Sequence, residues 1–267
     1  MSHPLAEAAA HLLRDTVISS TPLHGGDLSE VVSVTLAAHG TVVAKSGPAP
    51  ATEGRMLRAI AATGAPAPAV LAMNDRVLVI EALPEHAGLG AAGWAHLGRS
   101  LRQLHASTGP HYGWPEDYAF GPVPIPNPTS SNWPDFWRSA RLYPLAQALP
   151  ARSSNRLLSL PLDDFLPASP PASLLHGDMW TGNLLANGDR ISALIDPACY
   201  WGHGEVDLAM LCLFGNPPQC FWDAYGPLSD GWPLRRAIYQ LWPALVHLHL
   251  FGRGYLGLVE AQLDAIP

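Results

Sequence analysis

The amino-acid sequence predicts an α+β fold with two lobes: a small β-rich lobe at residues 1–82 and a larger, mostly helical lobe at residues 83–267. Two observations support this division. Runs of β-branched residues separated by turn residues occupy much of the first 82 positions, which is typical of a small sheet. Beyond them, apolar residues recur mostly at helical spacing, apart from one hairpin at residues 174–199. The change from strands to helices marks the predicted lobe boundary.

The composition fits a globular protein. Of 267 residues, 48% are hydrophobic and 14% are charged, which allows a substantial core. The formal net charge of −7 argues against a general affinity for nucleic acid or an anionic membrane. We find no signal peptide and no apolar run long enough to span a membrane, and the three cysteines form no CxxC pair. We therefore expect a cytoplasmic protein, and we expect a monomer or a weak dimer.

The elements of the first lobe follow from local patterns. A helix is expected at residues 3–14, which are rich in alanine and leucine, and another at residues 51–62, which carry an apolar stripe. Strands are expected where β-branched residues cluster between turns. These strands are residues 17–21, 31–36, 41–45, 70–72 and 76–80.

One lysine stands out in this lobe. Fourteen of the fifteen basic residues are arginine, so Lys45 is the single lysine of the chain. Because lysine offers a compact ammonium on a slim stem, its use here indicates a position that arginine would not fit. Glu53 lies beside the apolar stripe of the helix at residues 51–62, where a carboxylate needs a cationic partner, and Lys45 is the candidate. The alternative is an ordinary charge at a strand edge and an ordinary helix cap.

The second lobe begins after Glu81-Ala82-Leu83-Pro84. Leucines at helical spacing predict a helix at residues 94–106. Residues 107–130 are rich in proline and aromatic residues, and we expect an extended surface segment there. Helices are expected at residues 133–149 and 154–166, each interrupted by a proline, at residues 205–214, and once or twice more within residues 234–260.

The hairpin at residues 174–199 carries the strongest chemical signal. Asn187-Gly188 lies between two apolar runs and predicts the turn, because both residues tolerate positive φ. A hairpin brings its ends together, so Asp178, Asn183 and Asp196 should converge. Two carboxylates and an amide oxygen suit a hard cation such as Mg²⁺. The alternative is that these residues only form turns around the two strands.

The spacing His-x-Asp-x-x-x-x-Asn, with an aspartate beyond the next strand, is typical of a kinase active site. In that chemistry Asp178 would accept the proton of the acceptor hydroxyl, and Asn183 and Asp196 would bind Mg²⁺. A nucleotide would lie in the cleft between the lobes. The expected nucleotide contacts are Lys45, Glu53, Gly25, Gly26, Glu81 and Leu83. His176 and Asp207 are expected to support the predicted catalytic loop, residues 176–183.

The run His176-Gly177-Asp178-Met179-Trp180-Thr181-Gly182-Asn183 resembles the signature of the fructosamine kinase (ketosamine 3-kinase) family. Ile195–Ala198, Tyr200–Glu205 and Leu213–Gly215 also fit that family. Trp180 is informative, because relatives that act on aminoglycosides or choline usually carry another residue there. The resemblance implies a protein-kinase-like fold, ATP and Mg²⁺ as cosubstrates, and phosphorylation of a ketosamine at its 3-hydroxyl. Ribulosamine and fructosamine adducts are such acceptors, and their phosphorylation leads to deglycation.

The expected partner is a small sugar amine or a glycated lysine. Acceptor contacts should come from the helical lobe, with Trp180, Trp201 and His203 as candidates. Two alternatives stay open. One is a kinase of an aminoglycoside, an amino alcohol or a free sugar. The other is a catalytically silent, kinase-like binding module, although every expected polar catalytic position is filled.

Overall fold

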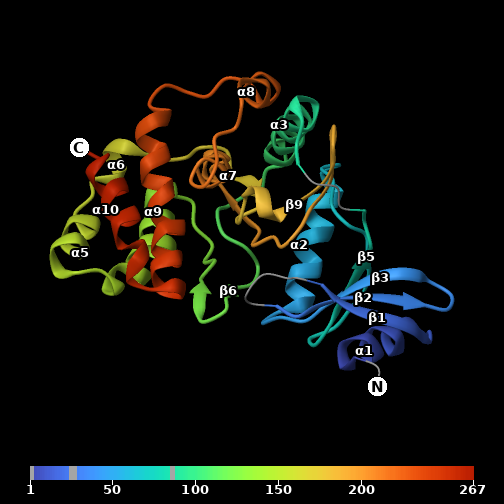
Figure 1. Ribbon diagram of the computed structural model, residues 1–267. Coiled ribbons are helices and arrows are strands. Elements are labelled where there is room, and N and C mark those ends of the chain that lie inside the picture. Colours follow the sequence, from blue (N-terminus) through green and yellow to red (C-terminus); the bar gives the residue numbers. More distant parts are fainter. Residues whose placement is uncertain (1–2, 24–28, 85–87) are drawn as a thin grey trace.

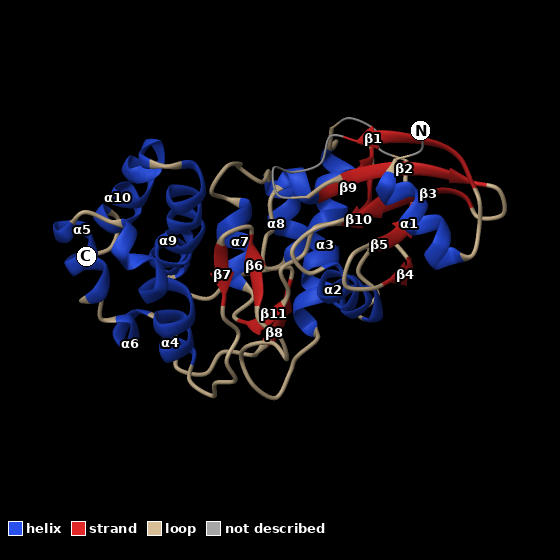
Figure 2. Cartoon of the chain, turned by 90° about the horizontal axis from the view of Figure 1, so that it is seen from below, coloured by secondary structure: helices blue, strands red, loops and turns tan. Residues whose placement is uncertain are grey.

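A computed structural model describes residues 3–23, 29–84 and 88–267 and shows two lobes (Figures 1 and 2). In Figure 1 the small sheet and helix α2 lie on one side, and helices α5, α9 and α10 lie on the other. The predicted α+β class with a small β-rich lobe and a larger helical lobe is confirmed. The boundary at residue 82 stays a prediction.

The N-terminal lobe contains a five-stranded antiparallel sheet in the order β1-β2-β3-β5-β4. Alternate side chains of β2 are buried, as expected for a strand with one covered face, and they pack with apolar residues of α1. The elements lie within two residues of their predicted starts and ends. They are α1 Pro4–Leu13, β1 Val17–Leu23, β2 Val31–Leu36, β3 Gly40–Lys45, α2 Pro50–Ala62, β4 Val70–Met73 and β5 Leu78–Glu81.

The C-terminal lobe is mostly helical and carries three two-stranded sheets. No helix in the described parts of the chain combines the length and apolar character that crossing a lipid bilayer requires. In chain order the elements are α3 Ala91–Ala106, β6 Tyr118–Phe120, β7 Val123–Ile125, α4 Trp133–Phe136, η1 Trp137–Leu142, η2 Tyr143–Ala148, α5 Ala151–Leu158, α6 Leu162–Phe165, β8 Ser173–Leu175, η3 Thr181–Asn183, β9 Leu184–Asn187, β10 Arg190–Leu194, β11 Tyr200–Gly202, α7 Glu205–Leu211, α8 Gln219–Tyr225, α9 Trp232–Phe251, η4 Arg253–Tyr255 and α10 Leu256–Asp264.

Proline interrupts both helices predicted at residues 133–149 and 154–166, as the sequence indicates. The helix expected at residues 133–149 is one α-helical turn followed by the π-helical η1 and the 3₁₀-helical η2, which has Pro144 in its first turn. The helix expected at residues 154–166 is two helices, α5 and α6, with Pro161 between them. The segment expected to be extended contains the hairpin β6–β7, and α8 was not predicted.

A buried arginine ties the helices to the strands that flank the catalytic loop. Arg141 on η1 is fully buried, and its guanidinium carbon lies 4.1 Å from the ring centroid of Tyr200 on β11. It also donates to the carbonyl of Pro126 over 2.6 Å and to Asn127 Oδ1 over 2.7 Å. Strand β11 pairs with β8, so the strand before the catalytic loop and the strand after its hairpin are held together. The helical core thereby positions both ends of the catalytic segment.

Candidate active site

The hairpin predicted around residues 174–199 is formed by β9 and β10. These strands pair antiparallel, with Asn187 opposite Arg190 and Leu184 opposite Leu194. The two-residue loop is therefore Gly188-Asp189, one position later than predicted, and Gly188 has a φ of +58°. Beyond β10, the backbone N–H of Ile195 donates to the carbonyl of Asn183 over 3.0 Å. The hairpin thus brings Asp196 beside the start of β9, as its sequence predicts.

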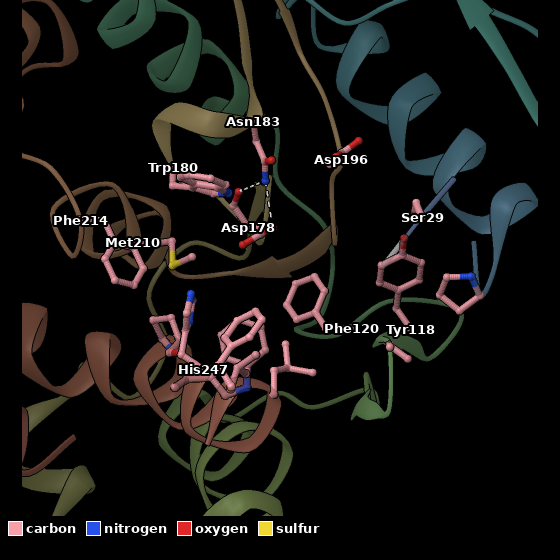
Figure 3. A pocket seen from close by; sticks show the side chains of 18 of the residues that line it. Ser29, Tyr118, Phe120, Asp178, Trp180, Asn183, Asp196, Met210, Phe214 and His247 are labelled. Atoms are coloured by element: carbon pink, nitrogen blue, oxygen red, sulfur yellow. Dashed lines mark hydrogen bonds between the residues drawn. The ribbon is translucent and has the colours of Figure 1, made fainter. Parts of the chain in front are cut away.

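Asp178 and Asn183 contact each other directly at the entrance of this hairpin. Asn183 Nδ2 donates to Asp178 Oδ2 over 2.9 Å and to the Asp178 carbonyl over 2.8 Å. Burial raises the pKa of Asp178 to about 7, although the hydrogen bond from Asn183 opposes that shift. Figure 3 shows Asp178, Asn183 and Asp196 around one cavity. A carboxyl group with a near-neutral pKa is suited to exchange a proton with a hydroxyl.

Lys45 links the two lobes through carboxylates. The last residue of β3 is Lys45, and its Nζ lies 2.8 Å from Glu53 Oε1 and 2.6 Å from Asp196 Oδ1. Burial disfavours the charged amine, but the two carboxylates outweigh burial and raise the pKa of Lys45. Helix α2 can approach the sheet because residue 54 is glycine: a Cβ there would lie 3.0 Å from Leu78 Cδ1. That close packing places Glu53 on the buried face of α2.

The oxygen donors near this ion pair fit a hard cation. Asp196 adopts a φ of +55°, a left-handed conformation that aspartate tolerates, and its Oδ1 accepts from Lys45. Its Oδ2 has no hydrogen-bond partner among the described residues. In the same parts of the chain, no group of three histidines, cysteines or acidic residues is placed to hold a metal. The amide oxygen of Asn183 and the carboxylate oxygens of Asp196 are the candidate donors, and oxygens of this kind suit Mg²⁺.

A network of hydrogen bonds holds the loop before Asp178. Asp207 on α7 accepts from the backbone N–H groups of His176 and Gly177 over 2.7 and 2.9 Å. His105 Nε2 lies 3.0 Å from the same carboxylate. Gly177 has a φ of +81°, and a Cβ at this position would collide with the carbonyl of Ala198. The network therefore requires glycine in the loop and an acceptor at position 207.

His176 is an internal brace of this loop. Its Nε2 lies 2.9 Å from the carbonyl of Ile195, and its Nδ1 accepts from the backbone N–H of Asp178 over 3.3 Å. A ring that donates from Nε2 and accepts at Nδ1 is neutral. Burial lowers the pKa of His176, which favours this neutral form. His176 thus joins the segment before Asp178 to the segment before Asp196.

The C-terminal lobe also holds helix α2 from outside. Glu116 precedes β6, and its Oε2 lies 2.6 Å from Arg55 Nη2. The same oxygen accepts from Thr52 Oγ1 over 2.7 Å. Thr52 and Arg55 flank Glu53 on α2. Glu116 therefore holds the helical turn that carries Glu53, the partner of Lys45. The sequence analysis did not identify Glu116.

The other predicted nucleotide contacts are less well placed. Gly25 and Gly26 lie outside the described residues. Glu81 ends β5, is exposed, and accepts from the backbone N–H of Ala69 over 3.3 Å. Leu83 follows it and is half-buried. Neither Glu81 nor Leu83 lines the cavity that contains Asp178, so their contact with a nucleotide stays a prediction.

The predicted acceptor residues divide into two groups. Trp180 is 39% exposed and lines the cavity beside Asp178, and its indole packs over Gly182, where a Cβ would collide with it. Trp201 and His203 are not among the residues that line this cavity. Trp201 packs against Trp114, with ring centroids 6.1 Å apart, and His203 is held by Tyr239 at 2.8 Å. Both side chains thus lie outside the lining of this cavity, and their contact with the acceptor stays a prediction.

The cavity has a volume of about 740 Å³ and extends from Lys45 into the helical lobe. Besides the predicted residues, it is lined by aromatic side chains that the sequence analysis missed. The hairpin β6–β7 supplies two of them, and Figure 3 shows both rings facing the cavity. The missed aromatic residues are Tyr118, Phe120, Phe214, Trp242, His247, Phe251 and Tyr255.

The sequence profile described as fructosamine kinase matches residues 7–266. A protein of Thermus thermophilus named "Probable ketoamine kinase" is 34% identical over 260 residues, which are 91% of this chain and 92% of that protein. The protein-ribulosamine 3-kinase of Arabidopsis thaliana is 34% identical over 185 residues, or 64% of this chain. The matched segment spans 61% of a similar Synechocystis protein, 65% of one from Enterococcus faecium and 56% of the Arabidopsis protein.

Solved structures show the same fold. A crystal structure from Thermobifida fusca, named "putative fructosamine-3-kinase", matches with a TM-score of 0.86 and 29% identity, and the match covers 98% of both chains. A macrolide 2'-phosphotransferase from Brachybacterium faecium matches with a TM-score of 0.63 over 98% of this chain and 96% of that one, at 18% identity. The second match shows the shared kinase-like fold alone. The profile match over nearly the whole length and the agreement of the fold place this chain in the fructosamine kinase family.

Proposed function

We propose that this protein is an ATP-dependent kinase that phosphorylates the 3-hydroxyl of ketosamines, with ribulosamine or fructosamine adducts as acceptors. The observation that carries the proposal is the direct contact of Asp178 with Asn183. Asp196 lines the same cavity and is paired with Lys45, which is also paired with Glu53. Family membership supports ATP-dependent phosphoryl transfer, and the name of the Arabidopsis relative supports a ribulosamine as acceptor.

Asp178 is the base in this proposal. Asn183 donates to its Oδ2, so its Oδ1 is left to accept the proton of the acceptor hydroxyl. The near-neutral pKa of Asp178 suits this exchange at physiological pH. Asn183 also holds the carboxylate in one orientation, and positioning of the acceptor supplies much of the rate in phosphoryl transfer.

The charged end of the cavity would bind ATP. Lys45 would contact the phosphates, with Glu53 holding its ammonium in place. Asn183 and Asp196 would hold Mg²⁺, which supplies positive charge against the phosphate oxygens when it is bound. Gly25, Gly26, Glu81 and Leu83 stay candidates for further nucleotide contacts. Trp180 would form a wall for the acceptor sugar, because its ring borders Asp178 in the cavity.

Phosphorylation at the 3-position would lead to deglycation. Phosphate is a better leaving group than hydroxide, so a 3-phosphorylated ketosamine breaks down and releases its amine. The acceptor can be a small sugar amine or a glycated lysine. A kinase of aminoglycosides fits less well, because Asp178 and Asp196 are the carboxylates among the described residues that line the cavity, and both have roles in phosphoryl transfer.

The test is ADP formation by the purified protein with Mg-ATP and a panel of acceptors. The panel contains a ribulosamine, a fructosamine, gentamicin, choline and free ribose. We expect turnover with the ketosamines and little with the other compounds. Turnover confined to gentamicin, choline or ribose would replace the proposed acceptor. If Mg-ATP neither binds nor turns over with any acceptor, the protein is a binding module and the proposal fails.

A further inference from the structure

Four aromatic side chains of the C-terminal lobe line the cavity, and the proposed reaction does not use them. Phe214, His247, Phe251 and Tyr255 form this group, which we call the distal aromatic cluster. The ring centroid of His247 lies 4.9 Å from that of Phe214, 5.1 Å from Tyr255 and 5.5 Å from Phe251. Figure 3 shows Phe214 and His247 bordering the same cavity as Asp178 and Trp180.

Three separate segments build the cluster. His247 and Phe251 are four residues apart on α9, so both lie on one face of the helix. Helix α9 ends at Gly252, which has a φ of +83°, and the short η4 then returns Tyr255 to within 5.8 Å of the Phe251 ring. Phe214 follows α7, whose Asp207 holds the catalytic loop. The cluster is therefore connected to the catalytic loop through α7.

The central ring of the cluster has a defined orientation. His247 Nδ1 lies 2.7 Å from the carbonyl of Pro243, one helical turn earlier. Because a carbonyl can only accept, Nδ1 carries a hydrogen and donates it to this carbonyl. The ring is thus fixed as part of the cavity wall.

The cluster leaves apolar surface uncovered inside a concave site. Phe214 is 48% exposed and Phe251 is 49% exposed. Of the eight large hydrophobic residues that are exposed in the described parts of the chain, three line this one cavity: Trp180, Phe214 and Phe251. Scattered exposed apolar residues need no explanation, but several in one concavity next to a catalytic base indicate a ligand surface.

The wall beyond Asp178 also lacks negative charge. The wall is completed by Met210, Trp242, Pro243, Val246 and Leu250. Its ionisable side chains among the described residues are His247 and Tyr255. A second ammonium group on the acceptor would be removed from water there without a carboxylate partner, which is costly. An apolar or aromatic group would instead gain by covering the exposed rings.

We propose that the distal aromatic cluster binds the substituent on the ketosamine nitrogen, and that it selects an apolar, above all an aromatic, substituent. This inference rests on the proposed function, because it requires the sugar to lie at Asp178 and Trp180. The sugar end of the acceptor is then held at the catalytic loop, while its amine end extends towards α9. Phe214, Phe251 and Tyr255 determine specificity for the amine part, and they take no part in the transfer of the phosphoryl group.

The test keeps the sugar constant and varies the amine. The acceptors are the ribulosamines of benzylamine, methylamine and putrescine, which offer an aromatic, a minimal and a cationic substituent. We expect kcat/KM for the benzyl adduct to exceed that for each of the other two by about tenfold or more, as for a hydrophobic group that fills its pocket. Phe251→Ala and Phe214→Ala should each reduce the benzyl-to-methyl ratio to about one or two.

Ile18→Ala is the matched control, because Ile18 is an exposed apolar residue on β1 and does not line the cavity. Its benzyl-to-methyl ratio should equal that of the unmodified protein. Thermal unfolding of each variant separates a loss of folding from a loss of specificity. A preference for the putrescine adduct, or a benzyl-to-methyl ratio that both cluster variants leave unchanged, would overturn the inference. Absence of turnover with every ribulosamine and with the corresponding fructosamines is a different result, which would refute the proposed function and the inference together.

Discussion

The proposed phosphoryl-transfer end of the cavity and its proposed acceptor end are held in place by different forces. At the first end, Lys45 contacts two carboxylates, and Asp178 contacts Asn183. At the second end, aromatic rings pack on one another. Among the described residues, one hydrogen bond orients a ring of the distal aromatic cluster, and it joins His247 to the carbonyl of Pro243. Polar contacts fix atoms within narrow limits, whereas apolar packing tolerates changes of shape. The first end should therefore tolerate little change, and the second should allow the choice of amine to vary.

The largest effect should come from the base. Asp178→Asn keeps the size of the side chain but removes its ability to take a proton, so we expect kcat with a ribulosamine to fall about 10³-fold. Binding of Mg-ATP, measured by calorimetry, should change little. A variant that retains kcat within a few-fold of the original would show that Asp178 is not the base.

The next largest effect should come from the lone lysine. Lys45 is 6% exposed and lies between Glu53 and Asp196. The planar guanidinium of Lys45→Arg needs more space and would displace one of these carboxylates, so kcat/KM for ATP should fall about 100-fold. Arg76→Lys, at an exposed position on the same lobe, is the control. Normal kinetics for Lys45→Arg would show that position 45 does not require lysine, contrary to the prediction from the sequence.

A third test uses the buried polar residues behind the catalytic loop. Burial lowers the pKa of His203 to about 4, whereas an unfolded chain has a histidine pKa of about 6.5. The unfolded chain therefore binds the proton more tightly, and the contribution of His203 to stability is complete above pH 6.5 and is lost as the pH falls towards 4. At pH 5 this loss is about 2 kcal/mol.

Urea unfolding at pH 7 and pH 5 measures that loss. His203→Gln should reduce the difference in unfolding free energy between the two pH values by about 2 kcal/mol. The same substitution at the exposed His11 is the comparison. An identical pH dependence for the His203 variant and the unmodified protein would contradict the role of burial at this site.

The smallest effect should come from the contact between the lobes. Glu116→Gln removes the charge that pairs with Arg55, and both side chains are partly exposed to solvent. Such pairs contribute about 1 kcal/mol or less, so we expect KM for ATP to rise only about two- to fivefold. The effect should weaken in high salt. A change in kcat/KM as large as that of Lys45→Arg would show that the lobes are coupled more tightly than this geometry indicates.

The difference between the two ends also explains what could be predicted from the sequence. Asp178, Asn183 and Asp196 lie within nineteen positions, and a local hairpin brings them together. Lys45 stands out in the sequence because it is the single lysine, and its position at the end of a strand determines where its side chain points. Local patterns of this kind predicted the N-terminal lobe almost to the residue.

The acceptor end depends on contacts between distant segments. Phe214, His247 and Tyr255 come from different elements, and no spacing in the sequence relates them. Trp201 and His203 are close to the catalytic loop in sequence, but the pairing of β11 with β8 and the contact with Tyr239 direct them away from the cavity. Asn187 was placed in the turn, whereas the strand pairing extends through it. Tertiary packing decides all these positions.

The most direct measurement is the position of the transferred phosphate. The protein is incubated with Mg-ATP and a ribulosamine, and the product is examined by ³¹P–¹H NMR before it breaks down. We expect the phosphorus to couple to the proton on carbon 3 of the sugar, and we expect Asp178→Asn to yield no such signal. A phosphate on another hydroxyl, or a ribulosamine that stays unmodified while ATP is consumed with a different acceptor, would contradict the proposed function.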